Sequence, residues 1–137
     1  MAAEALYLDT SAVLRAVLES GTSPDVEVRI RAARVLVSSR LALVETCRAL
    51  LRLRATGRAS EVQIAEARRG AEEVWARCEL WEISASVCEA ACAVAVDRGL
   101  RALDAVHLAT FVLARGHLPG LECLTVDDRL REALAGL

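Results

Sequence analysis

Four short apolar runs, separated by longer segments of helical periodicity, are the feature that most constrains this fold. Each run is too short for a helix and consists mainly of apolar residues, which is typical of a buried strand. The runs occupy residues 5–8, 35–38, 80–83 and 122–125. Strands separated by helices imply a parallel sheet covered by helices on both faces. We therefore expect an α/β protein with three layers, α/β/α.

Helical spacing and end signals place the helices between these strands. Ser60 and Gln63 can form a capping box, Gly57 suits the end of the preceding helix, and Pro24 suits the first turn of a short helix. Besides the short helix that begins at Pro24, the predicted helices cover residues 11–19, 40–56, 60–75, 84–97, 103–115 and 128–134. The chain has 137 residues and no repeat, linker or low-complexity tract, so we expect one domain over residues 1–137.

Charge and aromatic content limit the function classes. The net charge is −2, and the chain has four aromatic residues, which disfavours a stacking platform for single-stranded nucleic acid. All 17 basic residues are arginine, whose guanidinium matches phosphate with two parallel donors. One group of arginines reads either as a solvated face or as a set of phosphate contacts, and it comprises Arg48, Arg52, Arg54, Arg58, Arg68 and Arg69.

The sequence also predicts the compartment. The segment Met1-Ala2-Ala3-Glu4 has no basic region, so we expect no signal peptide. The longest apolar stretch, residues 102–114, is interrupted by Asp104 and His107 and is too short to span a bilayer. Five cysteines without a CxxC pair indicate buried free thiols in a reducing cytosol rather than a zinc site. We expect a soluble, cytoplasmic protein with no membrane partner.

Acidic residues lie where the predicted sheet would bring them together. Asp9 ends the first strand, Asp127 and Asp128 follow the last, and Asp104 starts the helix over residues 103–115. In an open parallel sheet, ligands bind beyond the carboxyl ends of the strands, the edge that helix starts also face. Each acid reads equally well as a helix N-cap, worth about 1 kcal/mol. Several carboxylates at one edge would repel one another unless a divalent cation binds, and oxygen ligands suit Mg²⁺ or Mn²⁺.

Two further residues have less certain places in this pattern. Periodicity in the helix over residues 40–56 predicts a core stripe of Leu43, Val44, Cys47, Leu50 and Leu51. Glu45 lies on the far side of that stripe, which indicates a solvated residue pairing with Arg48. His107 follows Asp104 by three residues and can face the same way, but a single histidine on an apolar helix is more often a core residue than a catalytic base.

Four segments in this order resemble the PIN-domain ribonucleases, and most closely the VapC toxins of bacterial VapBC toxin–antitoxin pairs. They span nearly the whole chain and are LDTSAVL at 8–14, SRLALVETCRAL at 39–50, LRALDAVHLAT at 100–110 and LTVDDRL at 124–130. The resemblance implies a PIN-like three-layer α/β/α sandwich with a central parallel sheet of four or five strands.

The resemblance also implies a site of four carboxylates that binds Mg²⁺, or Mn²⁺ in its place. Asp9 and Asp104 would be the principal ligands, and Glu45 and Asp127 would complete the set. Asp127 rather than its neighbour Asp128 fits the family pattern Thr-x-Asp-x-Arg-Leu. Two hydroxyl groups would contact the site, those of Ser11 and Thr125.

The activity implied by the resemblance is metal-dependent hydrolysis of RNA phosphodiester bonds by an endoribonuclease toxin. The implied partners are the RNA substrate, a VapB-type antitoxin whose C-terminal segment crosses the active crevice, and a second copy of the chain.

Three other readings use parts of the same pattern. A PIN-like interaction module without catalysis stays open. A receiver-type signalling domain would need a phosphorylatable aspartate after the third strand and a lysine, and the sequence has neither. A phosphatase of the haloacid-dehalogenase type would need Asp-x-Asp after the first strand, where Asp9-Thr10-Ser11 lacks the second acid.

Overall fold

The computed structural model describes residues 4–137, and Met1, Ala2 and Ala3, on which most of the interpretation of the N-terminus rests, lie outside them. In chain order the elements are β1 (Ala5–Leu8), α1 (Thr10–Leu18), α2 (Pro24–Ala32), β2 (Val35–Ser39), α3 (Leu41–Ala55), α4 (Glu61–Arg77), β3 (Cys78–Trp81), α5 (Ala85–Ala91), the 3₁₀ helix η1 (Val96–Arg98), α6 (Ala102–His117), β4 (Glu122–Leu124) and α7 (Asp128–Ala135). No helix among residues 4–137 is long and apolar enough to cross a membrane.

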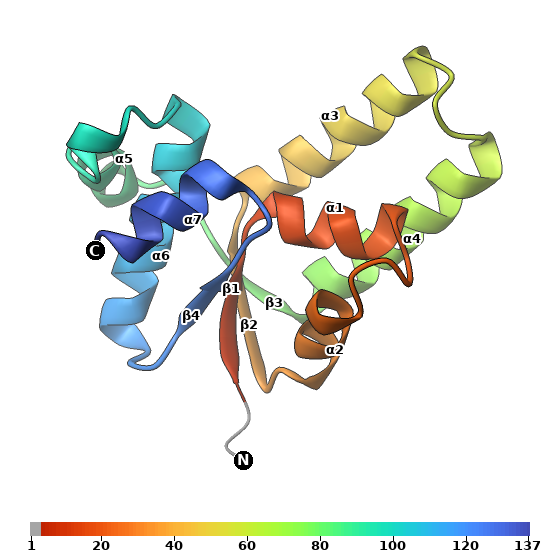
Figure 1. Cartoon of the computed structure of the whole chain (residues 1–137). Helices are drawn as coiled ribbons and strands as arrows, with labels where there is room; N and C mark the ends of the chain where they lie inside the picture. The colour runs from red at the N-terminus through yellow and green to blue at the C-terminus, as the bar shows by residue number, and fades with distance from the viewer. Residues whose placement is uncertain (1–3) are drawn as a thin grey trace.

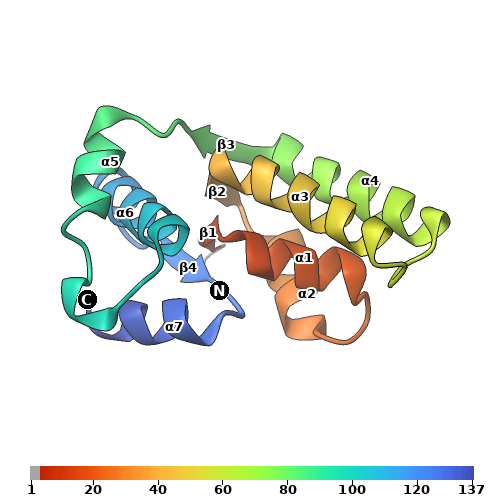
Figure 2. The same ribbon diagram turned by 90° about the horizontal axis from the view of Figure 1, so that it is seen from above.

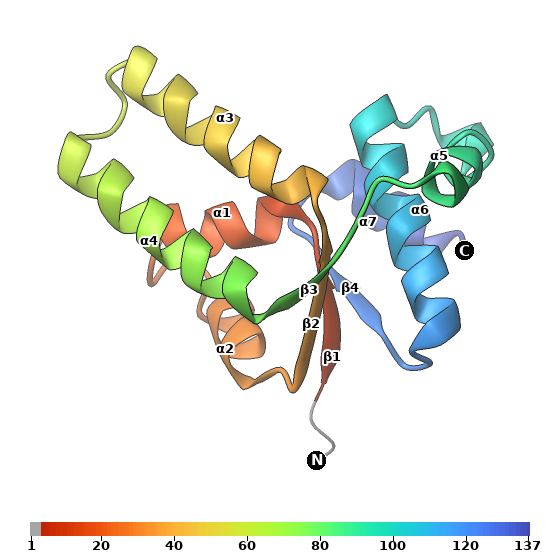
Figure 3. The same cartoon turned by 180° about the vertical axis from the view of Figure 1, so that it is seen from behind.

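The strands form one parallel sheet in the order β3-β2-β1-β4. Helices α1 to α4 cover one face, and α5 to α7 cover the other (Figure 2). Helices α3 and α4 form an antiparallel pair that extends well beyond the sheet (Figures 1 and 3). The expected α/β/α sandwich is confirmed, with four strands among residues 4–137.

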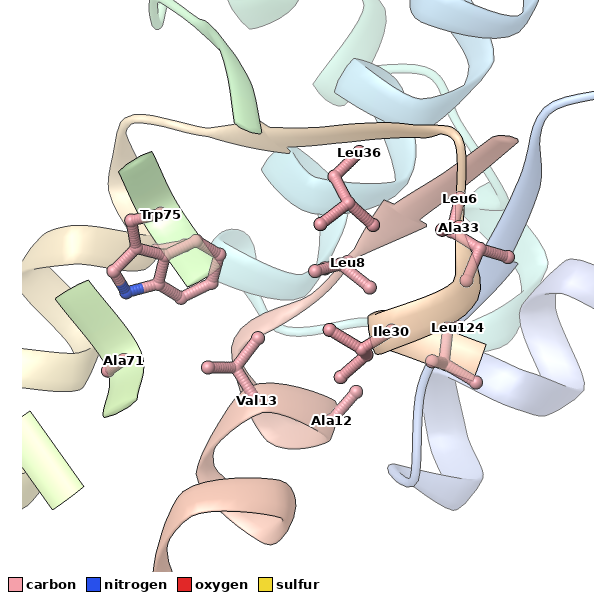
Figure 4. Close-up of a cluster of buried hydrophobic side chains, with 11 residues drawn as sticks. Leu6, Leu8, Ala12, Val13, Ile30, Ala33, Leu36, Ala71, Trp75 and Leu124 are labelled. Carbon is pink, nitrogen blue, oxygen red and sulfur yellow. The ribbon is translucent and has the colours of Figure 1, made fainter. Parts of the chain in front are cut away.

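Alternation along β1 builds a core on each face of the sheet. Leu6 and Leu8 pack with α1, α2 and the end of α4 (Figure 4), whereas Tyr7 packs on the other face with α6 and α7. All three side chains are completely buried. A central strand buried on both faces is apolar throughout, which is why residues 5–8 show no polar alternation.

The third strand lies two residues earlier than the predicted range of 80–83. Its register is set by β2, with Leu36 opposite Cys78 and Ser39 opposite Trp81. The Arg40 N–H donates to the Trp81 carbonyl at 2.9 Å, and β2 then turns into α3, so residues beyond Trp81 have no strand to pair with. The position of β3 is therefore set by the residues of β2 that are available for pairing, rather than by its own strand propensity.

The helix predicted over residues 84–97 ends at Ala91. Ser84 caps it as expected, accepting a hydrogen bond from the Val87 N–H. The chain then leaves the helix, and Ala95 adopts a left-handed φ of 45°. This break lets Val94 and Ala95 pack against the buried cluster around Tyr7.

The cysteines differ from the prediction of buried thiols. All five are free, but Cys47, Cys88 and Cys92 are exposed and only Cys78 and Cys123 are partly covered. Cys88 lies on α5 and Cys92 is its C-cap, and both are exposed to solvent.

Candidate active site

A cavity of about 350 Å³ lies among the elements that follow the carboxyl ends of the strands. Four carboxylates from separate parts of the chain line it. Asp9 follows β1, Glu45 lies on α3, Asp104 is in the first turn of α6, and Asp127 precedes α7. The remaining polar lining consists of Thr10, Ser11, Arg48, Arg52, Arg101 and His107. The predicted acids from distant segments therefore line one cavity.

Asp9 is both a helix cap and a lining residue of this cavity. Its Oδ1 accepts hydrogen bonds from the Ser11 hydroxyl at 2.7 Å and from the Ala12 N–H at 3.2 Å, which caps α1. Its Oδ2 accepts from the Thr125 hydroxyl at 3.0 Å. Only 5% of Asp9 is exposed, and burial raises the pKa of its carboxyl despite these hydrogen bonds. The interpretation of Asp9 as a helix N-cap is confirmed, and the same residue lines the cavity.

The hydroxyls of Ser11 and Thr125 join the ends of β1 and β4. Ser11 Oγ accepts from the Val126 N–H at 3.1 Å and lies 3.2 Å from Thr125 Oγ1. Thr125 Oγ1 accepts from the Asp127 N–H at 3.0 Å. Both side chains thus position backbone next to an acid, in addition to contacting Asp9.

Glu45 faces the cavity, so the prediction of a solvated Glu45 is wrong. The buried residues of α3 are Leu41, Ala42, Thr46 and Leu50, whereas Val44 is 57% exposed and Leu51 is 40% exposed. The helix is turned because it packs on the sheet at one end and against α4 at the other, where Leu50 meets Ile64. The buried face of such a helix changes along its length, so it does not coincide with a single stripe of apolar residues.

Two hydrogen bonds fix one oxygen of Glu45. Its Oε1 accepts from the Thr10 hydroxyl at 2.6 Å and lies 2.6 Å from His107 Nε2. Burial by itself would raise the pKa of the Glu45 carboxyl, but the hydrogen bonds with His107 and Thr10 outweigh it and lower the pKa. The carboxylate is therefore held in its ionised form at the wall of the cavity.

The last two acids are distinguished by their surroundings. Asp104 is 18% exposed and accepts a hydrogen bond from Arg101 Nε at 3.3 Å. Asp127 accepts from the Leu130 N–H at 2.9 Å and caps α7. The neighbouring Asp128 has a side chain 88% exposed, pairs with Arg131, and does not line the cavity.

The donor set fits a hard divalent cation in its chemistry. Only oxygen ligands come from the acids, and in the described part of the chain the second oxygens of Glu45, Asp104 and Asp127 accept no hydrogen bond. As the side chains stand, no three His, Cys, Asp or Glu residues among residues 4–137 are close enough together to hold a metal. Asp104 turns toward Arg101 instead, so binding a cation requires the carboxylates to draw together.

Asp9→Asn is expected to stabilise the protein in the absence of divalent cations. Asparagine keeps the acceptor that caps α1 and removes the buried charge. Because the pKa of Asp9 is raised in the folded protein, ionisation costs stability as the pH rises above its ordinary value of 3.8. The variant should therefore have the higher free energy of unfolding at neutral pH, and the difference should vanish at low pH. Urea denaturation in EDTA over a pH series measures it.

The exposed Asp128 provides the control for this stability measurement. Asp128→Asn removes one carboxylate without removing a buried charge, so its unfolding free energy should follow that of the wild type at every pH. An Asp9→Asn variant less stable than wild type at neutral pH would show that the buried charge is compensated.

Comparison with known proteins adds to this geometry. The family model of the PIN domain matches residues 6–134 of this chain. The chain is 34% identical over 125 residues to Ribonuclease VapC45 and Ribonuclease VapC49, each from a strain of Mycobacterium tuberculosis. Each alignment covers 91% of this chain and 85% of the relative.

Three solved structures share the fold. The protein PAE2754 from Pyrobaculum aerophilum matches with a TM-score of 0.65 and 22% identity, over 95% of this chain and 79% of that one. A toxin–antitoxin complex from Klebsiella pneumoniae matches with a TM-score of 0.57 and 19% identity. The match covers 87% of this chain and 96% of that one. VapBC2 from Rickettsia felis, bound to a DNA fragment from its promoter, matches with a TM-score of 0.59 and 11% identity. The match covers 89% of this chain and 98% of that one.

Proposed function

Because this chain belongs to the PIN-domain family and is related to the VapC ribonucleases, we propose that it is a metal-dependent endoribonuclease. The observation that carries the proposal is the convergence of Asp9, Glu45, Asp104 and Asp127 on one cavity flanked by arginines. Mg²⁺ is the proposed cofactor, and Mn²⁺ can take its place, because the acids offer only oxygen ligands.

The residues that line the cavity have different proposed roles in hydrolysis. Asp9 and Asp104 are the proposed principal ligands of the cation, with Glu45 and Asp127 completing the set. When bound, the cation supplies Lewis acidity toward the phosphoryl oxygen and lowers the pKa of water. Glu45 has one oxygen fixed by Thr10 and His107, and its Oε2 is left to orient the attacking water and accept its proton.

The simplest test is cleavage of RNA by the purified chain with and without free metal. We expect no cleavage in EDTA and full recovery when excess Mg²⁺ or Mn²⁺ is added, because four unneutralised carboxylates repel a phosphate. Gel analysis of labelled RNA ends measures this. Cleavage that continues in EDTA would contradict metal dependence, and RNA binding in Mg²⁺ without cleavage would favour a non-catalytic interaction module.

Arg48 and Arg52 are the proposed phosphate contacts of the RNA. Both are exposed, both line the cavity, and neither forms an ion pair within residues 4–137. Arg54, further along the same helix, instead pairs with Glu61 at 3.0 Å. The structure thus separates two arginines that can reach substrate from one that is engaged elsewhere.

Arg52→Ala is expected to weaken RNA binding uniformly across sequences. Losing one phosphate contact should reduce the slope of log K against log salt by about 1. Fluorescence anisotropy at several salt concentrations, with Ca²⁺ in place of Mg²⁺ to suppress cleavage, measures the slope. Arg54→Ala is the matched control and should leave it unchanged; equal slopes for Arg52→Ala and the wild type would rule out the contact.

We extend the proposal to partners from the names of the related proteins. The curated relatives are named VapC, and two of the structures with the same fold are of toxin–antitoxin assemblies. We therefore propose a cytoplasmic toxin that pairs with a VapB-type antitoxin and forms a homodimer. Induced expression of the chain should stop growth, and co-expression of the cognate antitoxin should restore it.

A further inference from the structure

A line of buried polar side chains runs from the core to Glu45. Tyr7, from the central strand β1, is completely buried, and His107, from α6, is 3% exposed. The Tyr7 hydroxyl lies 2.8 Å from His107 Nδ1, and His107 Nε2 lies 2.6 Å from Glu45 Oε1. The two rings meet edge to face, with centroids 6.0 Å apart. One continuous set of hydrogen bonds thus joins the sheet to the wall of the cavity.

Hydrogen-bonding capacity assigns the donor at one end of this line. An ionised carboxylate only accepts, so the proton between Glu45 and His107 belongs to Nε2. At the other end, the Tyr7 hydroxyl is hydrogen-bonded with Nδ1 at 2.8 Å and is also close to the Thr110 side chain. His107 is therefore the donor toward Glu45, and its other ring nitrogen is held by the central strand.

This arrangement suits His107 for holding a neighbour rather than for reacting. The ring is almost completely buried, and both nitrogens already have partners. No nitrogen is left to take a proton from water or from RNA. The effect of the ring is instead on Glu45, whose Oε1 is held by two donors, His107 and Thr10.

We propose that His107 is a positioning residue that holds Glu45 at the cavity, and that the Tyr7 hydroxyl, bonded with Nδ1, holds the orientation of the His107 ring. The proposal rests on the proposed function, in which Glu45 contributes to the cation and water site. A metal-binding side chain is commonly oriented by a hydrogen-bonded partner behind it, and loss of such a partner reduces metal affinity or activity by about 10–100-fold. Here the partner behind Glu45 is a histidine anchored in the sheet.

Three substitutions separate positioning from simple packing. His107→Leu fills the space without a donor, His107→Gln restores a donor toward Glu45, and Tyr7→Phe removes only the hydroxyl. We expect His107→Leu to lower kcat and Mn²⁺ affinity by about 10–100-fold with KM for RNA unchanged. His107→Gln should recover most of both, and Tyr7→Phe should give a smaller loss of both.

Thr46→Val is the matched control. Thr46 is buried and next to Glu45 in the chain, but its hydroxyl donates to the Ala42 carbonyl within α3 at 2.7 Å. Its loss should change stability alone. Calorimetric titration with Mn²⁺, RNA cleavage kinetics and urea denaturation are measured on all four variants and on the wild type.

Nitrogen-15 NMR of the histidine ring provides a readout that requires neither metal nor RNA. The wild-type spectrum should show His107 protonated on Nε2, and Tyr7→Phe should shift the Nδ1 signal. Wild-type kcat and Mn²⁺ affinity in His107→Leu would overturn the positioning role while leaving the ribonuclease standing. A wild-type chain that neither cleaves RNA nor binds Mn²⁺ would overturn both.

Discussion

Asp9→Asn is expected to lower kcat for RNA cleavage by about 10²–10³-fold, because a cation at a reacting phosphate contributes several kcal/mol and each 1.36 kcal/mol is tenfold in rate. The substitution removes one negative charge from the lining of the cavity. It preserves the side-chain oxygen that accepts from Ser11 and from the Ala12 N–H, so α1 keeps its cap. The loss of activity should therefore occur in a folded protein.

The control for this substitution is again the neighbouring acid outside the cavity. Asp128→Asn changes net charge equally, but its side chain is 88% exposed and pairs only with Arg131 within residues 4–137. It should cleave RNA at the wild-type rate. Full activity in Asp9→Asn, measured as kcat on the same RNA in Mg²⁺, would remove Asp9 from the mechanism.

The parts of the fold that depend on local signals could be predicted from the sequence. The capping box of Ser60 and Gln63 and the first strand over residues 5–8 are as expected. Asp9 and Asp127 were placed at strand ends, and both lie at the cavity and cap the helices that follow. For both acids, capping the next helix and lining the cavity therefore go together.

The parts that depend on distant partners could not be predicted. β3 ends at Trp81 because β2 offers partners only as far as Ser39, which no pattern within residues 78–83 reveals. The side of α3 that is buried depends on where α4 packs, so periodicity placed Glu45 on the wrong face. For Glu45, the resemblance to PIN-domain sequences was the better guide.

The spacing between Asp104 and His107 predicts the position of His107 but not its hydrogen bonds. The three-residue separation from Asp104 indicated a shared side of α6, and both residues do line the cavity. The prediction of a core residue is confirmed by its burial. Its hydrogen bonds to Tyr7 and Glu45 join residues 100 and 62 positions away, and they are visible only once the sheet is assembled.

The second large effect is expected in metal binding. Asp104 makes its only side-chain hydrogen bond within residues 4–137 with Arg101, so Asp104→Asn leaves the core and the caps intact. Asp104 is a proposed direct ligand, so its loss should weaken Mn²⁺ binding by at least about 100-fold, the upper end of what removing an outer partner does. The expected loss is thus a property of the site rather than of folding.

A calorimetric titration of metal-free protein with Mn²⁺ tests the central claim that the four carboxylates form one cation site. We expect saturable binding by the wild type and by Asp128→Asn, and at least about 100-fold weaker binding by Asp9→Asn and Asp104→Asn. Equal affinity in all four proteins, or no saturable binding by the wild type, would contradict it.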